Sequence, residues 1–207
     1  ANGNAGGGQA AIGQWPMRMA GRLATLHETP IGILNGALGG QPISYFQRDD
    51  ADPANLGTNY GRLLTRMRAA GLDASVRAIL WYQGESDGAD FQAHHDGFLA
   101  LKQDWSEDYP DIERLYVTQL RAGCGGNLIR TQEVQRKLAD DFAEITVMST
   151  TGLDGHDGCH YAYAAGYREL GDRYVGLLGR DLYGETPALD VLPPNPSSAT
   201  FAGGGTQ

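Results

Sequence analysis

The sequence lacks long apolar runs and is poor in basic residues. No stretch approaches the roughly 18 uninterrupted apolar residues that a membrane-spanning helix needs, and no basic-then-apolar signal segment opens the chain. Asp and Glu outnumber Lys and Arg by 25 to 16, giving a net charge of -9 with no basic stripe to offset it. The lack of apolar runs predicts no membrane span. The negative net charge would repel a phosphate backbone, so we do not expect nucleic acid as a partner.

Cysteine is also scarce. Cys124 and Cys159 are too few for a disulfide-rich scaffold, and they do not have the CxxC spacing of a zinc site. His94, His95 and Asp96 are consecutive, and adjacent helical positions point in different directions, so they cannot chelate one ion well. We predict a solvated helical face there and no metal site.

Length and composition indicate one globular domain. The chain has 207 residues, of which 41% are hydrophobic and 20% charged. We place the domain at 14–190, with a Gly/Ala/Asn-rich linker or loop at 1–13 and a Pro/Gly-rich linker to a possible following domain at 191–207. We expect the natural protein to continue in both directions.

Short apolar runs alternate with amphipathic segments, the pattern typical of an α/β fold around a mainly parallel sheet. The predicted helices cover 13–29, 60–71, 91–105, 129–142 and 161–182, and the predicted strands cover 30–34, 76–82, 115–120 and 145–148. In open α/β sheets ligands bind beyond the carboxyl ends of the strands. The glycine-rich and polar segments follow the predicted strands, at 35–41, 83–87, 121–124 and 154–160. Each segment taken alone is typical of a surface turn, but four of them at the carboxyl ends of the strands favour a ligand-binding or catalytic site.

Two of these segments contain residues suited to acyl transfer. Asp157 and His160 are three residues apart, so the carboxylate can approach the imidazole and fix its tautomer, as in the acid/base half of a catalytic triad. By itself this spacing is a weak signal. Gly40 offers a backbone N–H and Gln83 an amide donor, which together could form an oxyanion hole. The alternative for the glycines is a tight turn that requires positive φ.

Glu85 and Ser86 are ambiguous neighbours of Gln83. The Glu85 carboxylate could orient His160, bind sugar hydroxyls or anchor its loop, and we favour the anchor or a supporting role beside the catalytic residues. Ser86 has no G-x-S-x-G context and is not predicted to be a nucleophile.

The segments together resemble the sialate O-acetylesterase and acetylxylan esterase family of the SGNH hydrolase superfamily, over roughly 14–183. The resemblance rests on Pro30-Ile31-Gly32-Ile33 leading to Gly39-Gly40, on Trp81-Tyr82-Gln83-Gly84-Glu85-Ser86-Asp87, and on Asp157-Gly158-Cys159-His160 followed by Gly166-Tyr167-Arg168-Glu169-Leu170-Gly171. It implies a three-layer, flavodoxin-like fold and a serine esterase that removes acetyl groups from a carbohydrate such as sialic acid or xylan, without a cofactor.

The resemblance assigns roles to these residues. His160 would be the general base and Asp157 its orienting acid, with Glu85 as the competing acid, and Gly40 and Gln83 would line the oxyanion hole. Such enzymes place the nucleophile in a Gly-x-Ser loop after the first, central strand, and no serine of this sequence has that context, the candidates being Ser44, Ser75, Ser86, Ser106 and Ser149. We therefore expect an upstream segment or a second chain to supply both strand and serine. A carbohydrate-binding pseudoenzyme is the alternative, and a lipid or thioester hydrolase is less favoured.

Further expectations concern the rim, by which we mean the loops that follow the predicted strands, at 35–41, 83–87, 121–124 and 154–160. Cys124 and Cys159 lie on neighbouring loops, so a disulfide would brace the loop of His160 in an oxidising compartment. We accordingly expect a secreted or periplasmic protein. Arg121 and Arg130 are candidates for contacts with sugar hydroxyls or for anchoring loops.

Overall fold

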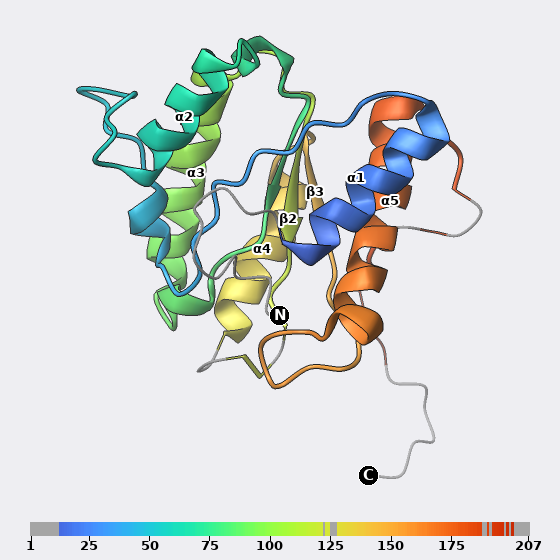
Figure 1. The fold of residues 1–207 in the computed structure, drawn as a ribbon. Helices are drawn as coiled ribbons and strands as arrows, with labels where there is room; N and C mark the ends of the chain where they lie inside the picture. Colours follow the sequence, from blue (N-terminus) through green and yellow to red (C-terminus); the bar gives the residue numbers. More distant parts are fainter. Residues whose placement is uncertain are drawn as a thin grey trace.

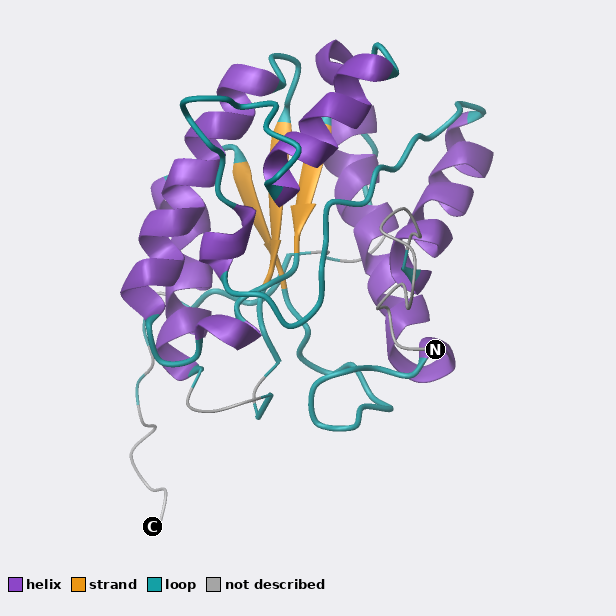
Figure 2. Ribbon diagram, turned by 60° about the vertical axis from the view of Figure 1, so that its left-hand side comes forward, coloured by secondary structure: helices purple, strands orange, loops and turns teal. Residues whose placement is uncertain are grey.

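The protein is a three-layer α/β/α structure. A computed structural model describes residues 13–121, 123–124, 128–187, 190, 192–196, 198 and 200. The sheet has three parallel strands in the order β1-β2-β3, which are β1 (Ala78–Trp81), β2 (Arg114–Thr118) and β3 (Ile145–Met148). Helices cover both of its faces (Figures 1 and 2). The predicted linkers at 1–13 and 191–207 lie mostly outside the described residues.

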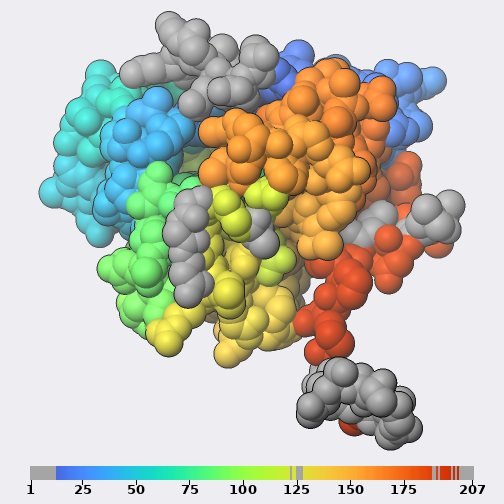
Figure 3. Space-filling model, turned by 90° about the horizontal axis from the view of Figure 1, so that it is seen from below, coloured from blue at the N-terminus to red at the C-terminus, as the bar shows by residue number. Residues whose placement is uncertain are grey.

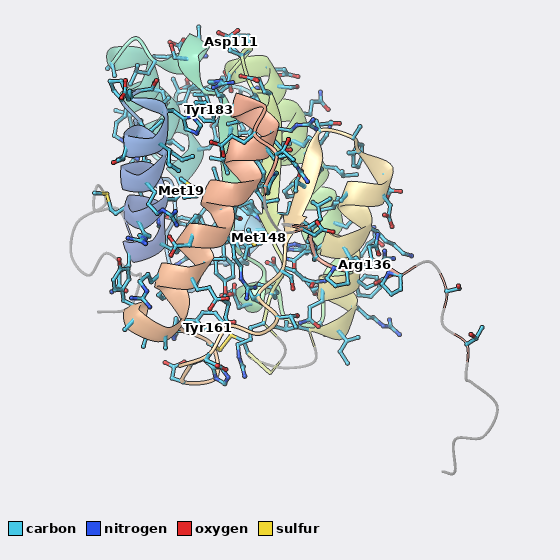
Figure 4. All side chains as sticks on the ribbon, turned by 90° about the vertical axis from the view of Figure 1, so that its right-hand side faces the viewer. Met19, Asp111, Arg136, Met148, Tyr161 and Tyr183 are labelled. Carbon is cyan, nitrogen blue, oxygen red and sulfur yellow. A yellow bond between two sulfur atoms is a disulfide. The ribbon has the colours of Figure 1, made fainter. Side chains whose placement is uncertain are left out.

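In the described ranges, five α-helices surround the sheet. They are α1 (Gln14–His27), α2 (Asn59–Ala69), α3 (Phe91–Asp108), α4 (Ile129–Asp141) and α5 (Arg168–Tyr183), the last preceded by a π-helical turn at Tyr163–Tyr167. On one face α1 and α5 lie side by side (Figure 4), joined by a hydrogen bond of 2.8 Å from Arg18 Nε to Asp172 Oδ1. Among the described residues, no helix has the length and apolar character that crossing a bilayer demands.

The sheet has a hydrophobic core on each face, because successive side chains of a strand point to opposite faces. Val117 of β2 is fully buried in the core beneath α2, α3 and α4, which also contains Leu64, Phe98 and Leu138. Its neighbour Tyr116 is fully buried in the other core, against α1 and α5. Parallel strands that are covered on both faces need apolar side chains on both, which explains the continuous hydrophobic runs of the sequence.

The predicted strand at 30–34 is wrong, because the structure has no strand there. Ile31 and Ile33 still pack against the core beneath α1 and α5, but in the part of the chain that the structure describes the segment pairs with no strand. A strand is defined by its ladder of hydrogen bonds, so an apolar run without a partner remains irregular. Within the described residues, β1 pairs only with β2, and its four residues are all half-buried, whereas those of β3 are all buried. Among the described residues, the outer edge of β1 is therefore open, as is that of β3.

The prediction of a solvated face at 94–96 is wrong for His94. Its residue exposure is 0%, whereas His95 and Asp96 have partly exposed side chains. His94 belongs to a buried stripe of α3 that continues with Phe98, Leu101 and Trp105. That spacing is the period of an amphipathic helix, so the helical repeat places this imidazole in the interior.

Candidate active site

The segments that follow the three strands gather at one end of the molecule. The chain leaves β1 into Gln83 and a 3₁₀ turn at Glu85–Asp87, leaves β2 towards Arg121, and leaves β3 towards the loop that carries His160. Figure 3 shows this end, where the orange segment around residue 160 lies beside the yellow-green segment around residue 120. Figure 4 places Tyr161 at this end of the molecule and Asp111 and Tyr183 at the other.

The loop of His160 is a tight, internally hydrogen-bonded turn. Asp157 Oδ1 accepts from the backbone N–H groups of Cys159 at 2.9 Å and His160 at 2.8 Å, and Asp157 Oδ2 lies 3.2 Å from His160 Nδ1. His156 and Tyr161 form an antiparallel bridge that closes the turn. At Gly155 φ is +68°, and a Cβ there would lie 2.4 Å from the Cβ of Ala165, so only glycine fits.

The contacts of Asp157 determine which nitrogen of the His160 ring is left to accept a proton. The backbone N–H groups of Cys159 and His160, and then the His160 ring, lower the pKa of Asp157 to about 2, so the carboxylate is charged at neutral pH. A charged Asp157 holds the proton of His160 on Nδ1. Nε2 has no partner among the described residues, and the side chain is 51% exposed. A lone pair is therefore presented to the solvent at the rim.

Two further contacts fix the same loop. Cys124 and Cys159 form a disulfide, which confirms the predicted pair and joins positions 35 residues apart. Arg121 donates from Nη1 to the carbonyl oxygen of Gly158 and approaches His156 Nε2 with Nη2 at 2.8 Å. Both terminal nitrogens of Arg121 thus face the loop, as expected of an anchor.

Gly40 lies in the turn that follows the irregular segment 30–34. Its φ is +75°, and a Cβ would meet nothing within 4 Å, so the backbone is open on that side. The Gly40 N–H has no acceptor among the described residues. A free backbone N–H at this position is what an oxyanion donor requires.

Gln83 is 8% exposed, and both of its amide hydrogens have acceptors. Nε2 donates to Asp87 Oδ2 at 2.9 Å and to the carbonyl oxygen of Gln41 at 3.2 Å. Oε1 is buried without a partner among the described residues. The opposite amide orientation would set Oε1 against two acceptors, so these partners determine which end of the amide points to the Gly40 loop.

Glu85 is half-buried, and its charge adds to burial in raising the pKa values of Tyr82 and Tyr167. Burial raises the pKa of its carboxyl group above the ordinary 4.5, although its own backbone N–H and the charge of His160 act in the opposite direction. No side chain among the described residues donates a hydrogen bond to it. The charge of His160 thus acts on this carboxylate, whose own backbone N–H is the hydrogen-bond donor found among the described residues.

The other rim residues have structural contacts. Arg130 lies on the exposed N-terminal turn of α4. Its guanidinium is 5.2 Å from the centre of the Phe91 ring, which begins α3. Arg130 is exposed, so it remains accessible to a ligand, in contrast to Arg121. The described residues contain no group of three or more His, Cys, Asp or Glu side chains that could hold a metal ion.

None of the described serines forms a triad with His160. The candidates in the body of the domain are Ser44, Ser75, Ser86, Ser106 and Ser149. Ser106 Oγ donates to the Gln103 carbonyl, and Ser149 Oγ accepts from the Thr151 N–H. In the part of the chain that the structure describes, no hydroxyl group is hydrogen-bonded to His160.

Sequence reasoning missed the polar network behind Gln83. Asp87 and His94 are joined at 2.7 Å, and their side chains are 3% and 0% exposed. Asp87 stands four residues after Gln83 in the W-Y-Q-G-E-S-D string, and the helical period of α3 places His94 inside. Together these two signals could have found the pair.

Comparison with known proteins agrees with this geometry. Residues 13–178 match the family model described as carbohydrate esterase, sialic acid-specific acetylesterase. The fold is similar to the X-ray structure of a protein from Arabidopsis thaliana, AT4G34215, with a TM-score of 0.63 and 22% identity over 87% of this chain and 72% of that one. No curated protein matches the sequence. The chain belongs to the sialic acid-specific acetylesterase family of carbohydrate esterases.

Proposed function

We propose that the protein removes acetyl groups from a carbohydrate by serine ester hydrolysis, with His160 as the general base. The observation that carries this proposal is the imidazole itself. Nδ1 faces a charged Asp157 at 3.2 Å, while Nε2 has no partner among the described residues, at the carboxyl end of the sheet where the glycine-rich loops lie. That is the arrangement a base needs in order to accept a proton from a hydroxyl nucleophile.

The rim also supports stabilisation of the intermediate. When serine attacks the acetyl carbonyl, its proton passes to His160 Nε2 and the carbonyl oxygen becomes negatively charged. The Gly40 N–H, which has no acceptor within the described residues, donates to that oxygen, and Gln83 Nε2 joins it by exchanging its bond to the Gln41 carbonyl, the longer of its two. His160 then returns the proton to the departing sugar oxygen, and water releases acetate from the acyl-enzyme.

We assign the nucleophile to a segment outside Ala1–Gln207, which adds a strand to the open edge of β1. Three observations favour this assignment. The outer edge of β1 has no strand partner among the described residues, the apolar segment 30–34 packs against the core without forming a strand, and no described serine contacts His160. Adding a strand would satisfy the open edge and place its carboxyl end at the same rim.

Asp157 is the acid partner of His160 in this proposal. It is the only carboxylate with a hydrogen bond to the ring in the described residues, whereas Glu85 is held nearby with its pKa raised chiefly by burial. Glu85 then serves as a supporting residue at the site. The disulfide between Cys124 and Cys159 supports an oxidising compartment, and we propose that the protein is secreted or periplasmic.

The test is acetate release by the full-length protein from acetylated sialic acid, acetylated xylan and a short-chain acetyl ester. His160→Ala should lower kcat by about 10²- to 10⁴-fold, the contribution of a general base. The matched control is His27→Ala, which removes an imidazole stacked on Tyr183, at the other end of the molecule. It should leave kcat unchanged.

Two results would reject the proposal. Equal kcat for His160→Ala and His27→Ala would remove His160 from the chemistry. Saturable binding of the acetylated sugar without acetate release would favour the pseudoenzyme instead.

A further inference from the structure

We infer that Asp87 and His94 are positioning residues that set the spacing between the Gly40 loop and the Gln83 side chain through one shared carboxylate. The inference rests on the proposed function for its effect on catalysis. Its structural part stands on the hydrogen bonds alone.

Three donors from different parts of the chain converge on Asp87. Oδ1 accepts from the Ile43 backbone N–H at 2.7 Å, and Oδ2 accepts from Gln83 Nε2 at 2.9 Å and faces His94 Nδ1 at 2.7 Å. Burial of Asp87 raises the pKa, but these hydrogen bonds outweigh burial and leave it below the ordinary 3.8. A charged carboxylate with three donors is a strong junction, because hydrogen bonds to an ionised group are stronger than neutral ones.

The orientation of the Gln135 amide indicates which ring nitrogen of His94 carries the proton. Gln135 Oε1 accepts from the Leu120 N–H at 2.9 Å, so the nitrogen of the same amide points the other way, to the Gln83 carbonyl at 3.1 Å. That nitrogen also faces His94 Nε2, in a weak contact of 3.5 Å. The contacts therefore favour an accepting Nε2 and a proton on Nδ1, from which the ring donates to Asp87 Oδ2.

The packing requires glycine at the centre of this network. Gly84 has φ of +139°, and a Cβ there would lie 3.0 Å from His94 Cε1 and 2.9 Å from a methyl group of Leu120. The backbone between Gln83 and Glu85 can approach the buried ring only without a side chain.

The network connects the two predicted oxyanion donors. Ile43 begins the 3₁₀ turn Ile43–Phe46, three residues after Gly40, and the Gln41 carbonyl accepts from the same Gln83 nitrogen that bonds Asp87. One amide hydrogen of Gln83 is thus committed to Asp87, which directs the other towards the Gly40 loop. Loss of His94 would free the carboxylate to turn and would misplace both donors.

A catalytic or metal-binding role does not suit this pair. With 0% and 3% exposure, neither side chain can reach a sugar ester, and each polar atom is directed at another part of the network. The residues act through Gln83 and Ile43.

The structural test uses nitrogen-15 NMR on the full-length protein. We expect His94 to carry its proton on Nδ1 and the Ile43 amide to exchange slowly. His94→Asn keeps a donor near the Nδ1 position and should preserve slow exchange, whereas His94→Leu should accelerate it at least about tenfold. Should His94→Leu fail to fold, Asp87→Asn is measured in its place. A proton on Nε2, or Ile43 exchange that is unchanged in the loss variant, would overturn the inference.

The catalytic test compares kcat and KM in the same variants. Displacement of the donors should lower kcat about 10²-fold in His94→Leu, with KM within about twofold, and His94→Asn should restore most of it. Tyr116→Phe is the control, because it removes another buried hydrogen bond to a carboxylate, 3.0 Å long to Asp181, from the core next to α5. An equal kcat loss in Tyr116→Phe, or no loss in His94→Leu, would reject the positioning role. If the wild type releases no acetate, the proposed function fails, and the NMR result still decides the structural claim.

Discussion

The two sides of the candidate site are held together by different interactions. The His160 side is exposed, and it is fixed by a disulfide, by Arg121 and by hydrogen bonds within its own turn. The Gln83 side is buried, and it is fixed by hydrogen bonds to the Asp87 carboxylate. Water competes for the hydrogen bonds of an exposed loop, so a covalent link adds most there. In the interior water is excluded, so hydrogen bonds suffice, but each lost partner is costly.

Removal of the disulfide should have the largest effect. The link closes a loop of 35 residues, and its loss should lower the free energy of unfolding by about 4 kcal/mol in the chain-entropy estimate. We expect Cys124→Ser/Cys159→Ser to show this loss in urea denaturation, with faster amide exchange at 155–162 and unchanged exchange at Ile43. Reductant should reproduce the effect in the wild type and have none in the double variant. Equal acceleration on both sides would remove the distinction between them.

The two aspartates offer a matched comparison of the buried and exposed sides. Asp87→Asn leaves buried donors facing an amide in place of a carboxylate and should cost about 3 kcal/mol of stability. Asp157→Asn changes an exposed turn and should lower Tm less than Asp87→Asn while lowering kcat. Calorimetry and acetate release would separate these outcomes. A larger fall in Tm for Asp157→Asn than for Asp87→Asn would reverse the comparison.

Arg121 tests whether the exposed side is anchored or binds sugar. If it anchors the loop of His160, Arg121→Ala should lower kcat about tenfold on both a sugar ester and a simple acetyl ester, since both need the imidazole in place. Arg130→Ala is the control on the same rim and should leave the simple ester unaffected. An increase in KM confined to sugar esters would identify Arg121 as a substrate contact.

Substitution of Glu85 should have the smallest effect, and it should raise stability where the other substitutions lower it. Burial raises the pKa of this carboxyl group in the folded protein above its ordinary 4.5. The free energy of unfolding therefore falls as pH rises from 4.5 through the raised pKa, because the unfolded protein loses this proton first. Glu85→Gln should therefore raise Tm at pH 7, and the difference should shrink as pH falls towards 4.5. A lower Tm at pH 7 would show that the charged carboxylate makes a stabilising contact. Thermal unfolding across this pH range measures it.

Local periodicity predicted most of the fold. The helices at α1 to α5 and the strands at β1 to β3 lie within the predicted segments or within three residues of them, because apolar spacing directly reflects burial. The segment 30–34 has the same apolar character, yet strand formation depends on a neighbour elsewhere in space, which spacing along the chain does not contain. The family and the disulfide were predicted correctly.

The site was predicted unevenly for a related reason. Asp157 and His160 are close in sequence, so their contact followed from spacing, and the structure has it at 3.2 Å. The engagement of both Gln83 hydrogens by Asp87 and Gln41 depends on three-dimensional packing and could not be read from the string. The polar run His94-His95-Asp96 predicts a solvated face, but adjacent helical positions face different surroundings, and His94 is the one that lies in the interior.

The most direct test of the account is to label the full-length protein with a fluorophosphonate, which forms a covalent bond with an activated serine, and to locate the modified residue by mass spectrometry. We predict one labelled serine outside Ala1–Gln207, with labelling lost in His160→Ala and retained in His27→Ala. Label on any serine within this sequence, or no His160-dependent label at all, would contradict the claim that His160 activates a serine carried by an added strand.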